Sequence, residues 1–371
     1  MTACEPYRIS LKAAPQTAGE LSQLQQQWQA LEATAPANFF LSWCWMSTWL
    51  VVYQPACQVV EICHEDQLVG LGLLTCETET RHRWLKSRVL RLAQTGNEQK
   101  DQIWIEYNDL LLHPDHLHSA PSAFVAFLMA RNDWDEFSLG ASLVERLKAY
   151  QHPELHPVER WEAPTYRVNL AGIRQQQKNY LASLSRNTRY QINRAKKAYE
   201  QHGPLQFEVL KDWQAIQPML ATLAQLHLQR WGEQHSGYSN PEFVRFHQAL
   251  TETGVNSGQI QLCVLTHQHQ VIGILYNFLY KNTVYFYLSG IEYGTDNKLK
   301  PGLLIHVFAI QYYLEQGYDF YDFMGGEAQY KSSLGECHGT LSVVSFQRNR
   351  LALRAEQWLR AVKNQSGIAR S

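Results

Sequence analysis

The chain has 371 residues, 45% of them hydrophobic and 18% charged, and a formal net charge of −1. This composition suits one or two globular domains with a sizeable core, and the near-neutral charge does not favour stable nucleic-acid binding. MTACEPYRIS lacks the pattern of a signal peptide, and the most apolar helix candidate, 39–53, is shorter than the ~20 residues of a membrane span. The seven cysteines contain no C-x-x-C pair. We therefore expect a cytoplasmic protein with reduced thiols and no transmembrane segment.

The first 165 residues predict one α/β unit. A glutamine-rich helix at 20–33 and an apolar helix at 39–53 come first, and strands follow to about residue 112. The stretch HPDHLHSAP then makes a turn before a helix at 122–131. His113, His116 and His118 in this turn have no helical i, i+4 pair and no nearby cysteine, so we expect a loop without a metal.

An internal repeat indicates a second, similar unit. Residues 64–74, HEDQLVGLGLL, align without gaps with residues 267–277, HQHQVIGILYN, so that Gly70 matches Gly273. An alternating strand precedes each copy, and each therefore predicts a β-hairpin with a polar turn. We expect units at 1–165 and 166–371, the first a degenerate copy because it shows no equivalent cofactor loop.

The second unit opens with a basic helix that follows Ser185, an acceptable N-cap. Arg186 and Arg189 lie in its first turns, and arginine grips phosphate or carboxylate in a bidentate manner. We predict that these two residues bind an anionic group of the substrate. A solvated helix face is the alternative.

A further helix ends with Arg230 and Trp231, followed by a loop rich in glycine and serine. A cation and an aromatic ring at such an end are expected to line an acceptor pocket. Simple core or interface packing is the alternative.

The most informative stretch runs from Val284 to Gly335. Strand VYFYLSG, loop KLKPG, a helix from Pro301 with Gly317 as its cap, and strand YDFYDF follow one another. A helix N-terminus after a strand offers N–H groups and a positive dipole end to a phosphate, and Lys298 and Lys300 add charge beside it. The pattern therefore favours a phosphorylated cofactor, although most helices after strands bind nothing.

The order of these motifs resembles a branch of the GNAT acyltransferase superfamily, the cellulose-biosynthesis-type (CelD-like) enzymes, which are related to Fem-type aminoacyltransferases. The segments FFLSWCWMSTWL, YNDLLLHPD, SLSRNTRYQINRAKK and LHLQRW, and GYDFYDFMGG before Tyr330-Lys331, carry this resemblance from about Asn38 to about Phe346. It implies tandem GNAT-like units, an α/β fold with mixed, mainly antiparallel sheets flanked by helices. It also implies acetyl-CoA or another acyl-CoA as co-substrate, without a metal.

The resemblance also suggests roles for residues. It implies a cofactor site at Leu288, Ser289, Lys298, Lys300, Gly302 and Leu303. In acyl transfer, Asp322 or Glu327 would accept a proton, Tyr330 would protonate the leaving thiolate, and Lys331 would stabilise charge or bind the acceptor. A structural ion pair of Asp322 with Lys331 is the alternative.

The better-known GNAT loop reads Q/R-x-x-G-x-G/A, whereas this chain has only Gly302, a Pro-Gly form that the resembled branch shares.

The expected acceptor is a small-molecule or glycan-linked amine or hydroxyl, as in cell-envelope or exopolysaccharide synthesis. Two other functions stay open: Fem-like transfer from aminoacyl-tRNA, and a non-catalytic GNAT-fold binding protein. A basic terminal helix is expected over 350–365.

Overall fold

The computed structural model describes residues 7–82, 85–296 and 298–356. The chain forms two compact units: unit 1 is Met1–Glu162 with the chain from Leu341 onward, and unit 2 is Ala163–Thr340. The first boundary is close to the predicted one at 165, but the chain after Thr340 clusters with unit 1, whereas the sequence placed it in the second unit. Residues 357–365 of the expected terminal helix lie outside the described residues.

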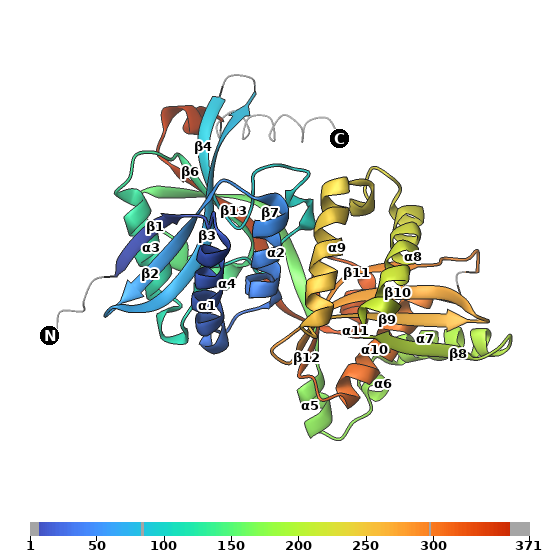
Figure 1. The fold of residues 1–371 in the computed structure, drawn as a ribbon. Helices are drawn as coiled ribbons and strands as arrows, with labels where there is room; N and C mark the ends of the chain where they lie inside the picture. Colours follow the sequence, from blue (N-terminus) through green and yellow to red (C-terminus); the bar gives the residue numbers. More distant parts are fainter. Residues whose placement is uncertain (1–6, 83–84, 297, 357–371) are drawn as a thin grey trace. The chain divides into compact units, whose positions relative to one another are not determined.

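Unit 1 is a sheet with helices against it (Figure 1). Its strand order is β1 (Arg8–Ala13), β2 (Cys57–His64), β3 (Gln67–Arg81), β4 (Leu85–Leu92), β6 (Glu136–Leu143) and the second half of β13 (Glu336–Arg348), with β5 (Leu111–Leu112) beside β3. β4 and β6 pair in parallel. The helices are α1 (Ala18–Thr34), α2 (Trp43–Tyr53), α3 (Ser119–Met129) and the short α4 (Val144–Leu147). The strands and α3 share one apolar core, in which Phe124 of α3 packs on Phe137 of β6.

Unit 2 repeats this pattern. Its strand order is β8 (Leu205–Leu210), β9 (Ile260–His267), β10 (Gln270–Tyr280), β11 (Thr283–Ile291), β12 (Phe320–Gly325) and the second half of β7 (Leu155–Asn169). β11 and β12 pair in parallel. The helices are α5 (Leu170–Gln175), α6 (Tyr180–Ser183), α7 (Arg186–Glu200), α8 (Trp213–Trp231), α9 (Pro241–Asn256), α10 (Pro301–Glu315) and α11 (Gln329–Leu334).

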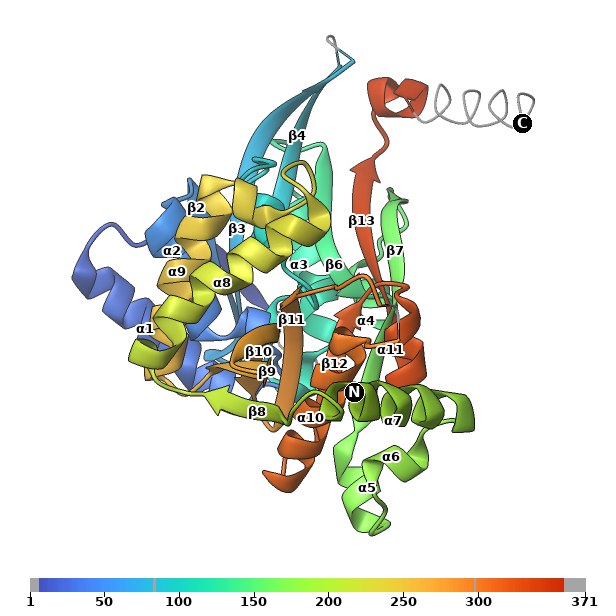
Figure 2. The same ribbon diagram turned by 90° about the vertical axis from the view of Figure 1, so that its right-hand side faces the viewer.

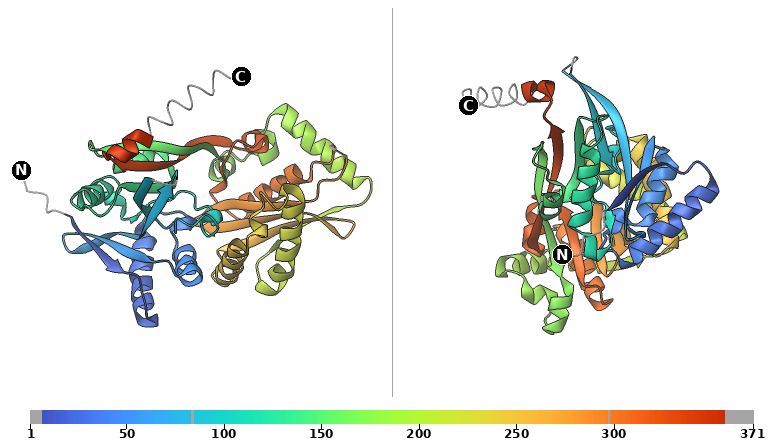
Figure 3. Two further views of the ribbon diagram at one scale, coloured as in Figure 1. Left: turned by 90° about the horizontal axis from the view of Figure 1, so that it is seen from above. Right: turned by 90° about the vertical axis from the view of Figure 1, so that its left-hand side faces the viewer.

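The helices of unit 2 cover both faces of its strands. α8 and α9 run side by side on one face (Figures 1 and 2), and α7 and α10 lie on the other, as the view from above shows (Figure 3, left). Buried side chains of α7 and α10 join Cys263, Leu265, Leu275 and Phe286 of the strands in one core. This layering places the beginning of α10 beside the ends of β11 and β12.

The structure confirms the predicted fold class and both hairpins. β2–β3 turns at Glu65-Asp66, and β9–β10 turns at Gln268-His269, with His64 opposite Gln67 and His267 opposite Gln270. All four turn residues have φ between 50° and 63°. Positive φ at both central residues gives the turn the twist that a two-residue hairpin needs.

None of the described helices combines the length and apolarity needed to cross a membrane.

Candidate functional site

The site begins where α10 begins. Its N-cap residue, Lys300, has a left-handed φ of 43° and makes no side-chain capping hydrogen bond, and Pro301 occupies the first turn. A Cβ at Gly302 would lie 3.2 Å from the hydroxyl of Tyr293, so glycine permits the close approach of the loop that precedes α10. Pro301 has no N–H, and the N–H groups of Leu303 and Leu304 donate to the carbonyl oxygen of Lys300. The helix end therefore presents the N–H of Gly302 and a positive dipole, with a lysine beside them.

The parallel strands beside α10 separate along their length. β11 and β12 pair only from Thr283–Tyr285 with Phe320–Asp322. Beyond Tyr285, β11 runs on to Ile291 without β12 as its partner, whereas β12 stays paired to β7. The gap between the two strands is where a ligand can reach the backbone.

A β-bulge in β11 decides which side chains face this gap. Phe286 opposes Asn277 of β10 and Leu288 opposes Tyr276, so Tyr287 is the extra residue. A bulge reverses the alternation of side chains after it. Phe286 faces α10, and Ser289 therefore also faces that side, whereas Leu288 turns to the other.

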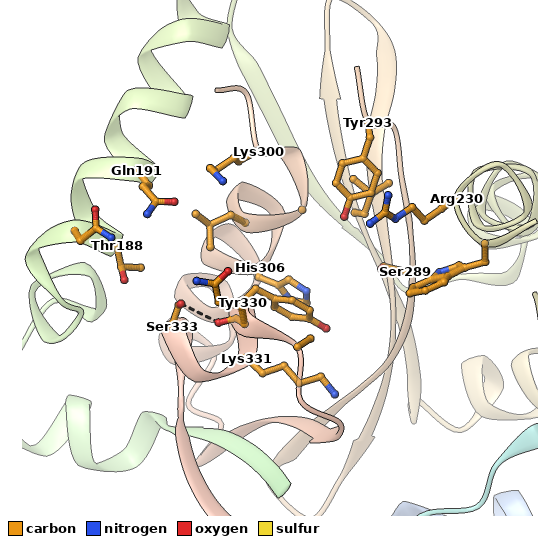
Figure 4. Close-up of a pocket in the computed structure, with 17 residues that line it drawn as sticks. Thr188, Gln191, Arg230, Ser289, Tyr293, Lys300, His306, Tyr330, Lys331 and Ser333 are labelled. Carbon is orange, nitrogen blue, oxygen red and sulfur yellow. Dashed lines mark hydrogen bonds between the residues drawn. The ribbon is translucent and has the colours of Figure 1, made fainter. Parts of the chain in front are cut away.

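A cavity of about 590 Å³ lies at this gap (Figure 4). All of its lining residues belong to unit 2. They come from α7, the end of α8, β11, the loop before α10, the first turns of α10, and α11 with the residue before it: Asn187, Thr188, Gln191, Arg230, Trp231, Ser289, Ile291, Tyr293, Lys300, Gly302, Leu303, His306, Ala328, Gln329, Tyr330, Lys331 and Ser333.

Two stacked rings form the inner part of the cavity. Tyr330 and His306 lie with their centroids 5.1 Å apart and their planes inclined by 15°. Burial lowers the pKa of His306 to about 3, with the charge of Lys331 adding to the effect, so the imidazole is neutral near pH 7. Its Nδ1 lies 3.1 Å from the hydroxyl of Tyr321. Burial raises the pKa of Tyr330, and its hydroxyl therefore stays protonated.

Lys331 anchors the end of β12 to α11. Its side chain is 8% exposed, and Nζ donates to the carbonyl oxygens of Gly325 and, at 3.5 Å, Met324. The ammonium group thus lies at the base of the cavity with backbone dipoles around it.

Eight of the predicted site residues line the cavity. The helix start contributes Lys300, Gly302 and Leu303, β11 contributes Ser289, and α11 contributes Tyr330 and Lys331. The end of α8 contributes Arg230 and Trp231. The structure thus brings residues of both predicted segments, the start of α10 and the end of α8, to one cavity.

Three predicted residues near α10 and β12 lie outside the lining. Leu288 is turned away by the bulge, and Lys298 is exposed in the loop, where its N–H donates to Asp296. Glu327 is exposed between β12 and α11.

Asp322 lies on the far face of β12. Its neighbours Tyr321 and Phe323 both contact His306 of α10, and side chains alternate along a strand, so Asp322 points away from the cavity. It is 4% exposed, accepts a hydrogen bond from the Met324 N–H at 2.6 Å, and lies 3.6 Å from Nε2 of His338.

The two predicted arginines of α7 also lie outside the lining. Arg186 is exposed at the first helical position. Arg189 donates to the carbonyl oxygens of Ala182 and Leu184 and so closes the end of α6. The α7 residues that face the cavity are instead Asn187, Thr188 and Gln191.

Helical spacing could have located His306, a lining residue that the prediction missed. Gly302 and Leu303 were identified, and His306 lies four and three residues further on, on the same face of α10. A single histidine in the apolar run PGLLIHVF was the visible signal. Tyr293, in an irregular loop, offered no such signal.

Among residues 7–82, 85–296 and 298–356, no group of three or more His, Cys, Asp or Glu side chains could hold a metal ion.

The chain was compared with protein-family models, curated protein sequences and solved structures. Residues 186–332 match the family model described as an acetyltransferase (GNAT) domain. A search among curated protein sequences found no match.

Three solved structures have a similar fold. The C-terminal domain of a putative lysylphosphatidylglycerol synthetase from Agrobacterium fabrum gives a TM-score of 0.54 at 10% identity, over 92% of this chain and 96% of that one. FemX gives 0.55 at 10% identity, over 86% and 95%. L-PGS from Bacillus licheniformis gives 0.53 at 10% identity, over 88% and 92%. The likeness is one of fold: the chain shares the fold of these three structures, and its residues 186–332 match a GNAT acetyltransferase domain.

Proposed function

We propose that the protein is an acyl-CoA-dependent acyltransferase that acts on an amine or hydroxyl acceptor. One observation carries the proposal: a single cavity joins the start of α10, with Lys300, to the gap between β11 and β12, with Ser289 and Tyr330. The helix start suits the pyrophosphate of CoA, and the gap suits its thioester. The matched acetyltransferase domain supports the same activity.

In the reaction, the acceptor nitrogen or oxygen attacks the thioester carbonyl, a tetrahedral oxyanion forms, and the carbon–sulfur bond then breaks. A backbone N–H of β11 near the bulge would stabilise the oxyanion, since the extra residue there leaves the regular ladder. The Tyr330 phenol, protonated at neutral pH, would give its proton to the thiolate.

The acceptor must also lose a proton. Of the two carboxylates predicted for this step, Glu327 remains our candidate because it directly precedes Ala328, a lining residue. Asp322 faces away and would act only by positioning β12.

The order of motifs along the chain supports the cellulose-biosynthesis-type branch and, with it, an acceptor of cell-envelope or exopolysaccharide synthesis. A second candidate is Fem-like transfer of an aminoacyl group from aminoacyl-tRNA. The fold similarity to FemX and to lysylphosphatidylglycerol synthetase favours it.

A comparison of donors separates the two candidates. The purified protein is incubated with acetyl-CoA or with charged tRNA and a mixture of amine and hydroxyl acceptors, and release of free CoA thiol or of deacylated tRNA is followed. Acceptor-dependent release of CoA alone supports the proposal. Acceptor-dependent discharge of tRNA, without release of CoA, would replace it with the aminoacyl-transfer function.

A further inference from the structure

The charged side chains that line the cavity are all cationic. They are Arg230, Lys300 and Lys331, and no aspartate or glutamate lines the cavity in the described part of the chain. His306 adds no charge near pH 7 because burial lowers its pKa to about 3. A cavity of this kind attracts anionic ligands. It disfavours a polyamine, because no carboxylate in its lining balances the charge of the polyamine's ammonium groups.

Two of the three cations already have a role or local partners. Lys331 donates to the carbonyl oxygens at the end of β12. Lys300 stands at the start of α10, where the proposed function places the pyrophosphate. Arg230 is therefore the lining cation that is available to bind a second anionic group.

Arg230 is held by aromatic rings rather than by an acid. Its guanidinium carbon lies 4.8 Å from the centroid of the Tyr293 ring and 5.7 Å from that of Trp231. Within the described residues it forms no hydrogen bond and no ion pair. Rings that contact the face of a guanidinium leave its N–H edge open, and that edge matches a carboxylate or phosphate in bidentate geometry.

The opposite wall has a different character. Figure 4 shows Thr188 and Gln191 of α7 on one side of the cavity and Arg230 with Tyr293 on the other, with Tyr330 between them. The α7 side chains are neutral donors and acceptors, suited to hydroxyl or amide groups. The cavity can therefore hold a polar molecule by its neutral part at α7 and by an anionic end at Arg230.

We propose that the acceptor carries an anionic group, a phosphate or a carboxylate, and that Arg230 binds this group between Trp231 and Tyr293. The attacking amine or hydroxyl then lies towards Ser289 and Tyr330. The identity of the ligand as an acceptor rests on the proposed function, whereas the anion site itself rests on the geometry around Arg230.

Three amino sugars that differ in their anionic group test this site: glucosamine, glucosamine 6-phosphate and muramic acid. Their binding to the full chain is measured by calorimetry for wild type, Arg230→Gln and Arg245→Gln. Arg245 is the matched control, because it is a surface arginine of α9 that pairs with Glu242 at 2.6 Å and does not line the cavity. Thermal unfolding checks that each variant is folded.

We expect at least one anionic sugar to bind about tenfold or more tightly than glucosamine in wild type and in Arg245→Gln. Arg230→Gln should abolish this preference. A comparison of glucosamine 6-phosphate with muramic acid shows whether the site prefers phosphate or carboxylate. Absence of any anionic preference, or a preference that survives Arg230→Gln, overturns the proposal.

A donor control separates this result from the proposed function. Acetyl-CoA and 3′-dephospho-acetyl-CoA are titrated into wild type and Arg230→Gln. Unchanged affinities agree with an acceptor-side anion site. A loss in Arg230→Gln that affects only acetyl-CoA would assign Arg230 to the donor phosphate and overturn the acceptor assignment. Failure of wild type to bind either donor would refute the proposed function, whereas the sugar titrations would still report on the anion site.

Discussion

His306 is a buried histidine that the folded protein keeps neutral, and this makes stability depend on pH. Its folded-state pKa of about 3 lies below the ordinary value of 6.5, so between these pH values the unfolded chain binds a proton that the folded chain does not. The free energy of unfolding should therefore fall as pH falls from 6.5 towards 3, by at most about 1.4 kcal/mol per pH unit for this group.

Urea unfolding at pH 6.5, 5.5 and 4.5 measures this dependence in wild type and His306→Phe, a change that keeps a ring against Tyr330. In His306→Phe we expect the slope of the unfolding free energy against pH to decrease by close to the contribution of one proton. The control His235→Gln, at an exposed position, should keep the wild-type slope. Equal slopes in all three proteins would show that His306 titrates normally in the folded state.

Tyr330 is the residue on which the proposed chemistry depends most directly. Tyr330→Phe keeps the ring that stacks on His306 but removes the phenol proton. With an accepted substrate we expect kcat to fall roughly 100-fold and KM to change little, as for the loss of a general acid. Steady-state kinetics checks this, with the exposed Tyr190→Phe as control. A variant with wild-type kcat would remove Tyr330 from the mechanism.

At the scale of elements, the bulge in β11 determines the shape of the site. The Tyr287 hydroxyl lies 3.1 Å from Nε2 of buried His247, whose Nδ1 has no hydrogen-bond partner in the described structure. Tyr287→Phe removes the hydroxyl group that lies beside Nε2 of His247. The Nε2 atom would then lose this partner, in addition to the unpartnered Nδ1. We expect a loss of about 1–3 kcal/mol in the free energy of unfolding.

The same substitution should loosen the bulge itself. Hydrogen exchange at the amides of Leu288 and Ser289 should become faster, and exchange at the β9–β10 turn should not change. If exchange is unaffected at Leu288 and Ser289, the bulge is fixed by the backbone pairing and not by His247.

Local signals predicted the helix α10 and the strand β11, but not the bulge within β11. Pro301 and Gly317 bracket the helix as expected, because proline suits a first helical turn and Gly317 adopts a φ of 87° after the last turn. The run VYFYLSG looks like one regular strand. Its bulge appears only in the register with β10, a long-range pairing that sequence alone does not reveal.

At the scale of the whole molecule, the second half of β13 completes unit 1. It pairs with β6 from Leu341 to Gln347, and Gln347 and Ser345 donate to the buried carboxylate of Glu136 at 2.7 and 2.8 Å. Burial alone would raise the pKa of Glu136, but hydrogen bonds from Arg81 and Ser87 lower it to about 2. A late segment of the chain thus stabilises a charge in the first unit.

Gln347→Leu tests this connection. Loss of one donor to a buried carboxylate should reduce the free energy of unfolding by about 1–3 kcal/mol. The control is Gln225→Leu at an exposed position of α8, which should have little effect. Chemical denaturation monitored by circular dichroism measures both. Equal stability of the two variants would contradict the part assigned to β13.

The internal repeat anticipated two units of one pattern, and Gly70 and Gly273 indeed occupy matching strands β3 and β10. The place of β13 was not predictable, because no local motif states which distant strand a C-terminal strand joins. The same limit applies to the cavity: its helix start and the end of α8 are short motifs, whereas its α7 wall depends on how α7 packs against α10.

In the proposed function, the start of α10 binds the phosphates of an acyl-CoA. Isothermal titration with acetyl-CoA tests it in wild type, Lys300→Ala and Lys298→Ala, since Lys300 lines the cavity and Lys298 lies outside it in the same loop. We expect micromolar binding that weakens about tenfold in Lys300→Ala and much less in Lys298→Ala. No binding by wild type, or equal losses in the two variants, would contradict it.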